Sequence, residues 1–346
     1  MNRNTIASIV AAAMMAGSQS AIAAWEALPD TAPAPDDNPT TAAKVELGKM
    51  LYMDPRFSST GTVSCNSCHN VMEGGDDSRT FSMGVHGKQG GRNAPTVWNS
   101  AFHSVQFWDG RADLLEDQAK GPVTNPVEMG MSDIEQAMDR VRAIPGYKPY
   151  FEEAFGKDSM TVDNAAKAVA AFERTLITPN SPYDRYVKGD KKAMTAQQVR
   201  GMETFESVGC TSCHSGAAFN GPKMPFGQGF YSKFPTFADN EYDKKYKFSA
   251  DKGREEVTGK AADANMFRVA TLRNITDTAP YFHNGAVNDL SEAVRVMAST
   301  QLNRDLKDAE VKDIVAFLSA LTGEYPEITM PRLPATSGYS IVAEQN

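Results

Sequence analysis

The sequence contains few cysteines, and this scarcity limits the class of protein that it can encode. Four cysteines in 346 residues are too few for the disulfide framework of a small secreted domain. Glycine and proline follow no period, so collagen-like and low-complexity chains are excluded. No run of alternating apolar and polar residues predicts a β-sheet. Hydrophobic residues make up 41% and charged residues 23% of the chain, which is typical of a folded globular protein.

Positive charge is also in deficit. The formal net charge at pH 7 is −8. Because nucleic-acid phosphates and anionic lipids repel an acidic chain, neither is an expected partner.

Long hydrophobic runs are missing as well. The longest apolar stretch, Ile6–Gly17, has 12 residues, fewer than the roughly 20 of a membrane-spanning helix. It follows Arg3 and precedes the small residues Ala21 and Ala23. This pattern predicts a cleaved export signal over residues 1–23, with a buried core helix as the alternative. We therefore expect a protein without a membrane span, exported to a bacterial periplasm.

All four cysteines fall in two copies of one motif, CNSCH at 65–69 and CTSCH at 210–214. In a CxxCH motif the two thiols add to the vinyl groups of one haem, and the histidine binds its iron. The two pairs are too far apart to suggest one zinc site, and a redox dithiol would not require both histidines. The motifs predict two covalently attached haem c groups. The attachment residues are Cys65, Cys68, Cys210 and Cys213, and the iron ligands are His69 and His214.

The chain also carries an internal repeat. The two motifs are 210 − 65 = 145 residues apart, and residues 164–176 resemble residues 309–321 at the same offset. One offset in two places predicts two related domains. In each domain an amphipathic helix would follow the CxxCH motif and pack near the haem, as in cytochrome c.

Capping patterns predict helices in both halves and an all-α fold of two cytochrome c-like domains. The expected helices run from Thr41 to about Tyr52, from Ser132 to about Ile144, and from Thr195 toward Cys210. A further helix begins at Asp289 and carries Met297, and the last runs from Asp308 to Gly323.

Domain boundaries follow from these patterns. Residues 24–180 form the expected N-terminal haem domain, and residues 181–346 form the C-terminal one. The proline-containing segment 178–190 is the expected linker between them. Residues 324–346 are predicted to be an irregular tail that can pack back on the first domain.

The sixth ligand of each iron determines whether the protein carries electrons or performs catalysis, because a catalyst needs an open position. His86, His103 and His283 are the histidines that remain. His86 lies in the glycine-rich loop 84–91, which can move, although a surface histidine would fit the same pattern. Met297 is on a predicted helix, where its position alone does not distinguish a ligand from a core residue.

Several segments outside the haem motifs match one family. They are Asn93–Val97, Gln106–Ala112, Gln118–Pro122, Asn125–Met129, Thr271–Asn274, Pro280–Gly285 and Glu292–Met297. With these segments the sequence resembles the bacterial dihaem cytochrome c peroxidase family over essentially the whole mature chain.

The resemblance implies different roles for the two haems. The N-terminal haem would be the low-potential, peroxidatic one, and His86 matches the distal histidine that blocks its iron in the oxidised enzyme. Met297 would be the sixth ligand of the C-terminal haem, where His/Met ligation raises the reduction potential. Glu128 and Gln118 match the distal-pocket pair at the peroxidatic haem, and Trp108 matches the tryptophan between the haems.

A calcium ion and two reaction partners are implied in the same way. Asn93, Thr278 and Pro280 match the calcium site, whose oxygen ligands suit a hard cation. The expected reaction reduces hydrogen peroxide to water after release of His86. Its electrons come from a small reduced cytochrome c or a cupredoxin and enter at the C-terminal haem. Members of the family are commonly homodimers, which we expect here too.

Two alternatives compete with this function. One is a related dihaem enzyme that oxidises a protein substrate, as in the maturation of tryptophan tryptophylquinone. That enzyme has a tyrosine where this chain has Met297. The other is a dihaem electron carrier with two six-coordinate irons and no catalysis, against which Gln118 and Glu128 argue.

Overall fold

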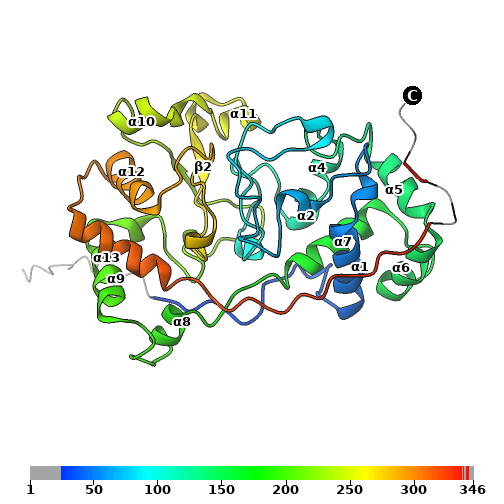
Figure 1. Ribbon diagram of the computed structural model, residues 1–346, viewed down its shortest axis with the longest axis horizontal. Helices are drawn as coiled ribbons and strands as arrows, with labels where there is room; N and C mark the ends of the chain where they lie inside the picture. Colours follow the sequence, from blue (N-terminus) through cyan, green and yellow to red (C-terminus); the bar gives the residue numbers. More distant parts are fainter. Residues whose placement is uncertain (1–24, 337, 339, 343–346) are drawn as a thin grey trace, which may run out of the picture.

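The structure, a computed structural model, describes residues 25–336, 338 and 340–342. The predicted export signal, residues 1–23, lies outside the described residues. Two helical halves lie side by side, one from α1 to α7 and the other from α8 to α13 (Figure 1). Within the described ranges, no helix is long and apolar enough to cross a membrane.

Short helices dominate both halves, joined by long irregular segments. The N-terminal half contains α1 (Ala42–Met53), α2 (Cys65–Cys68), α3 (Leu115–Gln118), α4 (Gly121–Thr124), α5 (Ile134–Arg142), α6 (Lys148–Phe155) and α7 (Val162–Glu173). The C-terminal half contains α8 (Pro182–Val187), α9 (Ala196–Val208), α10 (Glu241–Tyr246), α11 (Glu255–Thr258), α12 (Leu290–Leu302) and α13 (Asp308–Ser319).

The strands in the described part form one small antiparallel pair, so the fold is helical, as predicted. β1 (Tyr231–Lys233) pairs with β2 (Met266–Arg268), with Tyr231 opposite Arg268. The pair has only three residues in each strand. This is too short to produce the alternating pattern from which a sheet is predicted.

The internal repeat predicted from the sequence is also present in the packing of the helices, because each half contains one similar pair of crossed helices. Helix α1 packs against α7, and α9 packs against α13. A glycine lies at each crossing: a Cβ atom at Gly48 would overlap the carbonyl of Ala168, and one at Gly201 would overlap that of Asp313. Ala168 and Asp313 are 145 residues apart, which is the offset of the haem motifs. Both halves therefore use the same close helix contact.

Three predicted helix starts are confirmed by capping hydrogen bonds. The Thr41 side chain accepts from the Lys44 amide, and Asp289 accepts from the Glu292 amide. Thr195 forms the predicted capping box with Gln198 at the start of α9. Each bond satisfies an amide that the first turn of the helix leaves free.

Three other predicted caps were wrong. The cap of α5 is Asp133, whose carboxylate accepts from two amides of the first turn, rather than Ser132. This helix ends at Arg142, close to the predicted end near Ile144. Helix α13 begins after Lys307, so Asp308 is its first residue and not its cap. It ends at Ser319, and Gly323 instead lies against the carbonyl of Thr178.

The segment 178–190, the expected linker, contains α8 and contributes to the core. Tyr183 and Asp184 are fully buried, and Asp184 forms an ion pair of 2.8 Å with the equally buried Arg273. A charge buried this deeply requires a partner. The pair ties α8 to a segment 89 residues further along the chain.

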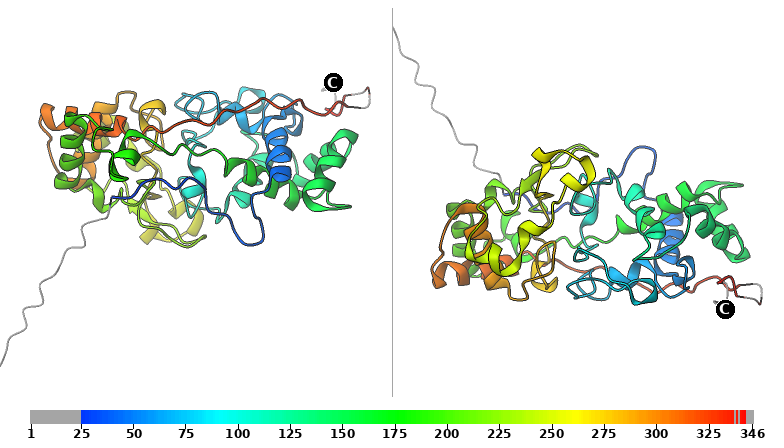
Figure 2. Two further views of the ribbon diagram at one scale, coloured as in Figure 1. Left: turned by 90° about the horizontal axis from the view of Figure 1, so that it is seen from below. Right: turned by 90° about the horizontal axis from the view of Figure 1, so that it is seen from above.

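Both ends of the described chain reach across to the opposite half (Figures 1 and 2). Near the start, Trp25 packs against the aromatic core of the C-terminal half, and the Leu28 amide donates to Asp184 at 2.8 Å. In the tail, Ile328 and Leu333 pack against the core of the N-terminal half. Each half is therefore covered in part by a segment from the other end of the chain.

Candidate functional site

Each CxxCH motif opens into a cavity. The first cavity encloses about 1610 Å³ of space, counting its open mouth, and Cys65, Cys68 and His69 line it. The second encloses about 1280 Å³ on the same measure and is lined by Cys210, Cys213 and His214. None of the four cysteines forms a disulfide bond.

The histidines of the two CxxCH motifs are held in the same way. The Nδ1 atom of His69 lies 2.9 Å from the carbonyl oxygen of Pro95, and that of His214 lies 2.9 Å from the carbonyl oxygen of Phe219. Since a carbonyl can only accept, each Nδ1 carries the proton and leaves the Nε2 lone pair free. Burial lowers the pKa of both imidazoles, which favours the neutral form that a metal requires.

Two of the predicted catalytic residues line the first cavity alone. Gln118 lies at the end of α3, and Glu128 lies in the loop after α4. The Nδ2 group of Asn125 donates to Oε1 of Glu128 at 2.7 Å. Burial raises the pKa of Glu128, and the Arg111 guanidinium opposes the rise only in part. The carboxyl group can therefore hold a proton more readily than one in water.

Trp108 lines both cavities. Its indole Nε1 donates to the backbone oxygen of Asn93 at 2.9 Å, which fixes the orientation of the ring. The ring therefore borders both cavities, and its place between two haems stays a prediction.

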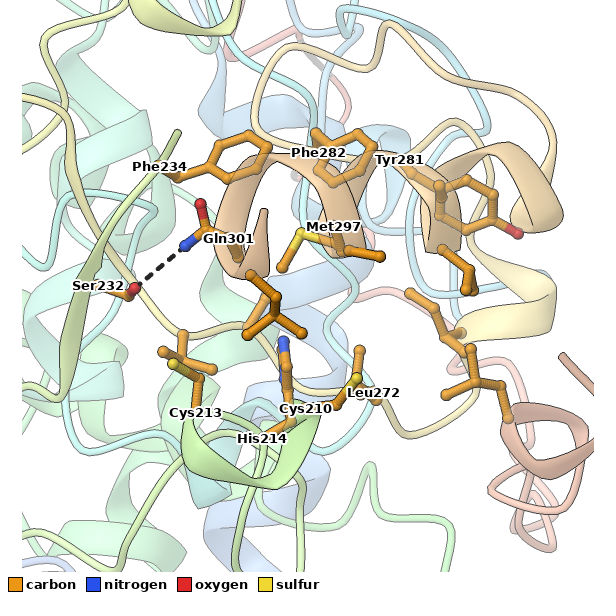
Figure 3. A pocket seen from close by; sticks show the side chains of 18 of the residues that line it. Cys210, Cys213, His214, Ser232, Phe234, Leu272, Tyr281, Phe282, Met297 and Gln301 are labelled. Atoms are coloured by element: carbon orange, nitrogen blue, oxygen red, sulfur yellow. Dashed lines mark hydrogen bonds between the residues drawn. The ribbon is translucent and has the colours of Figure 1, made fainter. Parts of the chain in front are cut away.

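Met297 and His214 point into the second cavity from opposite sides (Figure 3). Met297 comes from α12, whereas His214 follows the short 3-10 turn η5 (Cys210–Ser212). Aromatic rings of Phe234, Tyr281 and Phe282 close one end of this cavity (Figure 3). A thioether and an imidazole that face each other across an apolar slot suit the two axial positions of a haem.

His86 lies outside the first cavity in this structure. Its side chain is exposed, in the 3-10 turn η2 (Val85–Gly87), at a φ of 57°. Gly84, Gly90 and Gly91 of the same loop do line the cavity. The loop therefore borders the site while its histidine faces solvent.

The predicted calcium residues lie on two segments that are in contact. The Asn93 amide donates to the carbonyl oxygen of His283 at 2.8 Å, and its Nδ2 group donates to Arg79 at 2.8 Å. Pro280 is buried and Thr278 is half-buried. The described residues contain no group of three or more His, Cys, Asp or Glu side chains suited to a metal, so a cation here would depend on amide and carbonyl oxygens.

Comparison with known proteins relates the chain to one protein family. The family model for di-haem cytochrome c peroxidase matches residues 42–192. The cytochrome c551 peroxidase of Nitrosomonas europaea is 45% identical, with 86% of each chain aligned. The chain belongs to the di-haem cytochrome c peroxidase family. It is an enzyme, a cytochrome c peroxidase, and the family implies two haem c groups.

Two further relatives carry another name. The methylamine utilization protein MauG of Methylorubrum extorquens is 35% identical over 95% of this chain and 93% of its own. A solved MauG-like protein associated with microbial copper homeostasis superposes with a TM-score of 0.74, at 28% identity, covering 86% of this chain and 95% of that one. The peroxidase therefore shares its fold with proteins of the MauG type.

The cavities of the peroxidase fit the haem groups that the family implies. Each presents two cysteine side chains outside any disulfide and one imidazole with Nε2 available. In the first cavity the residues that would hold the haem are Cys65, Cys68 and His69. In the second they are Cys210, Cys213, His214 and Met297.

Sequence analysis missed one buried charge of the peroxidase. Arg268 lines both cavities, and its Nη1 group lies 2.9 Å from Nε2 of His103. Burial lowers the pKa of Arg268 to about 10 and holds the pKa of His103 well below its usual range. No local pattern reveals this contact, because the two residues are 165 positions apart.

Proposed function

We propose that the protein reduces hydrogen peroxide to water at the N-terminal haem. Its electrons come from a small reduced cytochrome c or a cupredoxin and enter at the C-terminal haem. The overall reaction takes one peroxide, two electrons and two protons to two waters. One observation carries this assignment: Glu128 and Gln118 line only the first cavity, Met297 lines only the second, and Trp108 lines both.

Glu128 is the proposed acid–base group. Bound in the first cavity, a haem supplies the redox centre at which peroxide is reduced. Cleavage of the O–O bond also requires a proton to move from the near oxygen to the departing one. A buried carboxyl held by Asn125 at 2.7 Å can perform this transfer. Burial raises its pKa, which makes it easier for this carboxyl to hold the proton that is being transferred.

Gln118 and Trp108 have supporting roles in this proposal. The amide of Gln118 can donate to peroxide or water in the first cavity and orient it. Trp108 provides an aromatic ring between the two sites and so an electron route between them.

His86 is the proposed gate. In the oxidised enzyme its imidazole would close the sixth position of the N-terminal haem, and reduction of the C-terminal haem would release it. The bordering glycines of the loop leave the backbone free to make this movement. His86 is exposed in the present structure, on a loop whose glycines border the first cavity.

The remaining proposals concern calcium, location and assembly. Calcium would bind Asn93 through its side-chain oxygen and Thr278 and Pro280 through backbone carbonyls. The export signal would direct the mature chain, with haem domains at 24–180 and 181–346, to the periplasm. The enzyme would act there as a homodimer.

A MauG-type oxidation of a protein substrate is the second candidate. The similarity to MauG and to the MauG-like structure favours it. Met297 argues against it, because the enzyme that matures tryptophan tryptophylquinone has a tyrosine at this position. A carrier without catalysis remains the third candidate, and it gives no reason for a carboxyl and an amide side chain in the first cavity.

The test is peroxide-dependent oxidation of a reduced small cytochrome c by the dihaem holoprotein. We expect two cytochromes oxidised per peroxide, and Glu128→Gln should lower kcat by about 10²- to 10⁴-fold. Glu153→Gln, on the exposed side of α6, is the matched control and should leave the rate unchanged. Equal rates for Glu128→Gln and the wild type would remove Glu128 from the reaction.

A further inference from the structure

A second carboxyl group lines the first haem cavity and has no role in the mechanism above. Glu173 is the last residue of α7, and its side chain lies along the same cavity as Glu128. The residue is only 5% exposed. Its Oε2 atom is buried without a hydrogen-bond partner in the described part of the chain.

The charged neighbours of Glu173 leave it without a direct counterion. The adjacent Arg174 is paired at 2.7 Å with the buried carboxylate of Glu116 on α3. The other titratable groups near Glu173 are the phenol of Tyr52 on α1 and the thiol of Cys65 on α2, neither of which is a cation.

The remaining helices packed against α7 present no charge to this site. The buried residues of α5 are Ala137, Met138 and Val141, and the buried residue of α6 is Phe151. Burial is the main cause that raises the pKa of Glu173, to about 8. Arg174 opposes this rise and Glu116 adds to it.

The internal repeat shows that this carboxyl is specific to one cavity. At the offset of 145 residues, Glu173 corresponds to Leu318 on α13, and Leu318 lines the second cavity. The two haem sites are therefore built on equivalent helices, but only the first places an ionisable group at this position. The difference coincides with the different roles of the two haems.

We propose that Glu173 couples reduction of the N-terminal haem to the uptake of one proton. This inference rests on the proposed attachment of that haem to Cys65, Cys68 and His69. Reduction of that haem by one electron would cancel one positive charge near the carboxylate. Glu173 would then take up one proton from the solvent, which restores the net charge of the haem site. Reoxidation releases the proton.

The physical basis is the low polarity of the cavity. A positive charge close to a buried carboxylate favours its ionised form, and loss of that charge favours the protonated form. Glu173 is therefore more basic when the haem is reduced. Over the pH range in which only the reduced state is protonated, the reduction potential falls by about 59 mV for each tenfold fall in proton concentration.

Redox titration of the dihaem holoprotein at a series of pH values tests the proposal. The potential of each haem is followed by its absorption spectrum from acid to alkaline pH. In the wild type we expect a sloping pH dependence for the N-terminal haem. Glu173→Gln should flatten that slope and leave the C-terminal haem unchanged. Asp163→Asn, on the same helix with its side chain 75% exposed, is the matched control and should keep the slope.

Two results would overturn the proposal: a slope in Glu173→Gln equal to that of the wild type, or a flat profile for the N-terminal haem in the wild type. The wild-type profile decides the matter if the variant does not accumulate as dihaem protein. The mass of the holoprotein, compared with that of a Cys65→Ala/Cys68→Ala variant, reports haem attachment separately. A wrong haem assignment would thus be distinguished from a wrong role for Glu173.

Discussion

At the scale of single residues, the two cavities differ in the polar groups added to a shared plan. Both present a CxxCH motif, a histidine held by a backbone carbonyl, and a helix at the same offset. The first adds Gln118, Glu128 and Glu173, whereas the second adds Met297. These few side chains are the basis on which we propose proton-coupled chemistry in the first cavity and electron transfer in the second.

Replacement of Met297 tests the electron-entry side. Met297→Leu removes the thioether that faces His214 across the second cavity. Because thioether ligation favours the reduced iron, we expect the potential of the C-terminal haem to fall by on the order of 0.1 V or more. Spectroelectrochemistry of the holoprotein measures this change.

The control for Met297 is an exposed methionine. Met330 is 58% exposed, so Met330→Leu should leave both potentials unchanged. An unaltered potential for the C-terminal haem in Met297→Leu would show that the thioether is not its ligand.

At the scale of helices, a glycine at each crossing allows the two helices to pack closely. A methyl group at Gly48 or Gly201 would overlap a backbone carbonyl of the opposite helix, and backbone atoms cannot move aside as a flexible side chain can. Each half therefore depends on one residue that has no Cβ.

Substitution of these glycines should destabilise the fold. We expect Gly201→Ala to lower the free energy of unfolding by about 1–3 kcal/mol, measured by denaturant titration of the holoprotein. Gly48→Ala should act similarly in the other half. Glu203→Ala, on the exposed side of α9, should change the value by less than about 0.5 kcal/mol. If Gly201→Ala matches Glu203→Ala, the crossing is not as tight as the structure indicates.

Local patterns explain which helices could be predicted from the sequence. The capping residues Thr41, Thr195 and Asp289 act within one turn, so the sequence alone contains the whole signal. At α5, Ser132 and Asp133 are adjacent and both can cap, and the carboxylate of Asp133 makes the bonds.

Other features depend on partners that are distant in the sequence. The segment that contains α8 reads as a linker because of its prolines, yet Asp184 is buried by its pair with Arg273. Arg268 and His103 likewise meet only in the folded chain. The haem motifs were readable because covalent attachment requires a fixed local spacing, whereas these contacts require the tertiary fold.

At the scale of the whole molecule, the two halves are joined by polar contacts as well as by the chain ends. Arg92, next to the His86 loop, pairs with Asp251 of the C-terminal half at 2.6 Å and with Glu256 at 3.0 Å. His103 accepts from Asn220 at 3.0 Å and contacts Arg268. The loop that carries the proposed gate is thus tied to the half in which electrons are proposed to enter.

The His103 contact makes stability depend on pH. Burial and the Arg268 charge hold the pKa of His103 below its usual range, so the imidazole is neutral in the folded protein. As pH falls below about 6.5, the unfolded chain binds a proton that the folded one does not. The free energy of unfolding should therefore fall from pH 7 to pH 5, by at most about 1.4 kcal/mol per pH unit from this group.

His103→Gln tests this contribution, because glutamine can still accept from Arg268 but does not titrate. Thermal unfolding midpoints at pH 7 and pH 5 should differ less in the variant than in the wild type. The other buried histidines still contribute in both proteins. An equal difference in the two proteins would show that His103 does not titrate with unfolding.

The most direct test of the account compares peroxide turnover in two redox states of the wild-type enzyme, both with calcium. One sample is fully oxidised, and the other has first received one electron at the C-terminal haem. The account predicts rapid oxidation of a reduced small cytochrome c only by the pre-reduced sample, and by both samples of His86→Gly. An absence of turnover in every sample, with cytochrome and cupredoxin donors alike, would contradict the assignment of peroxide reduction to the N-terminal haem.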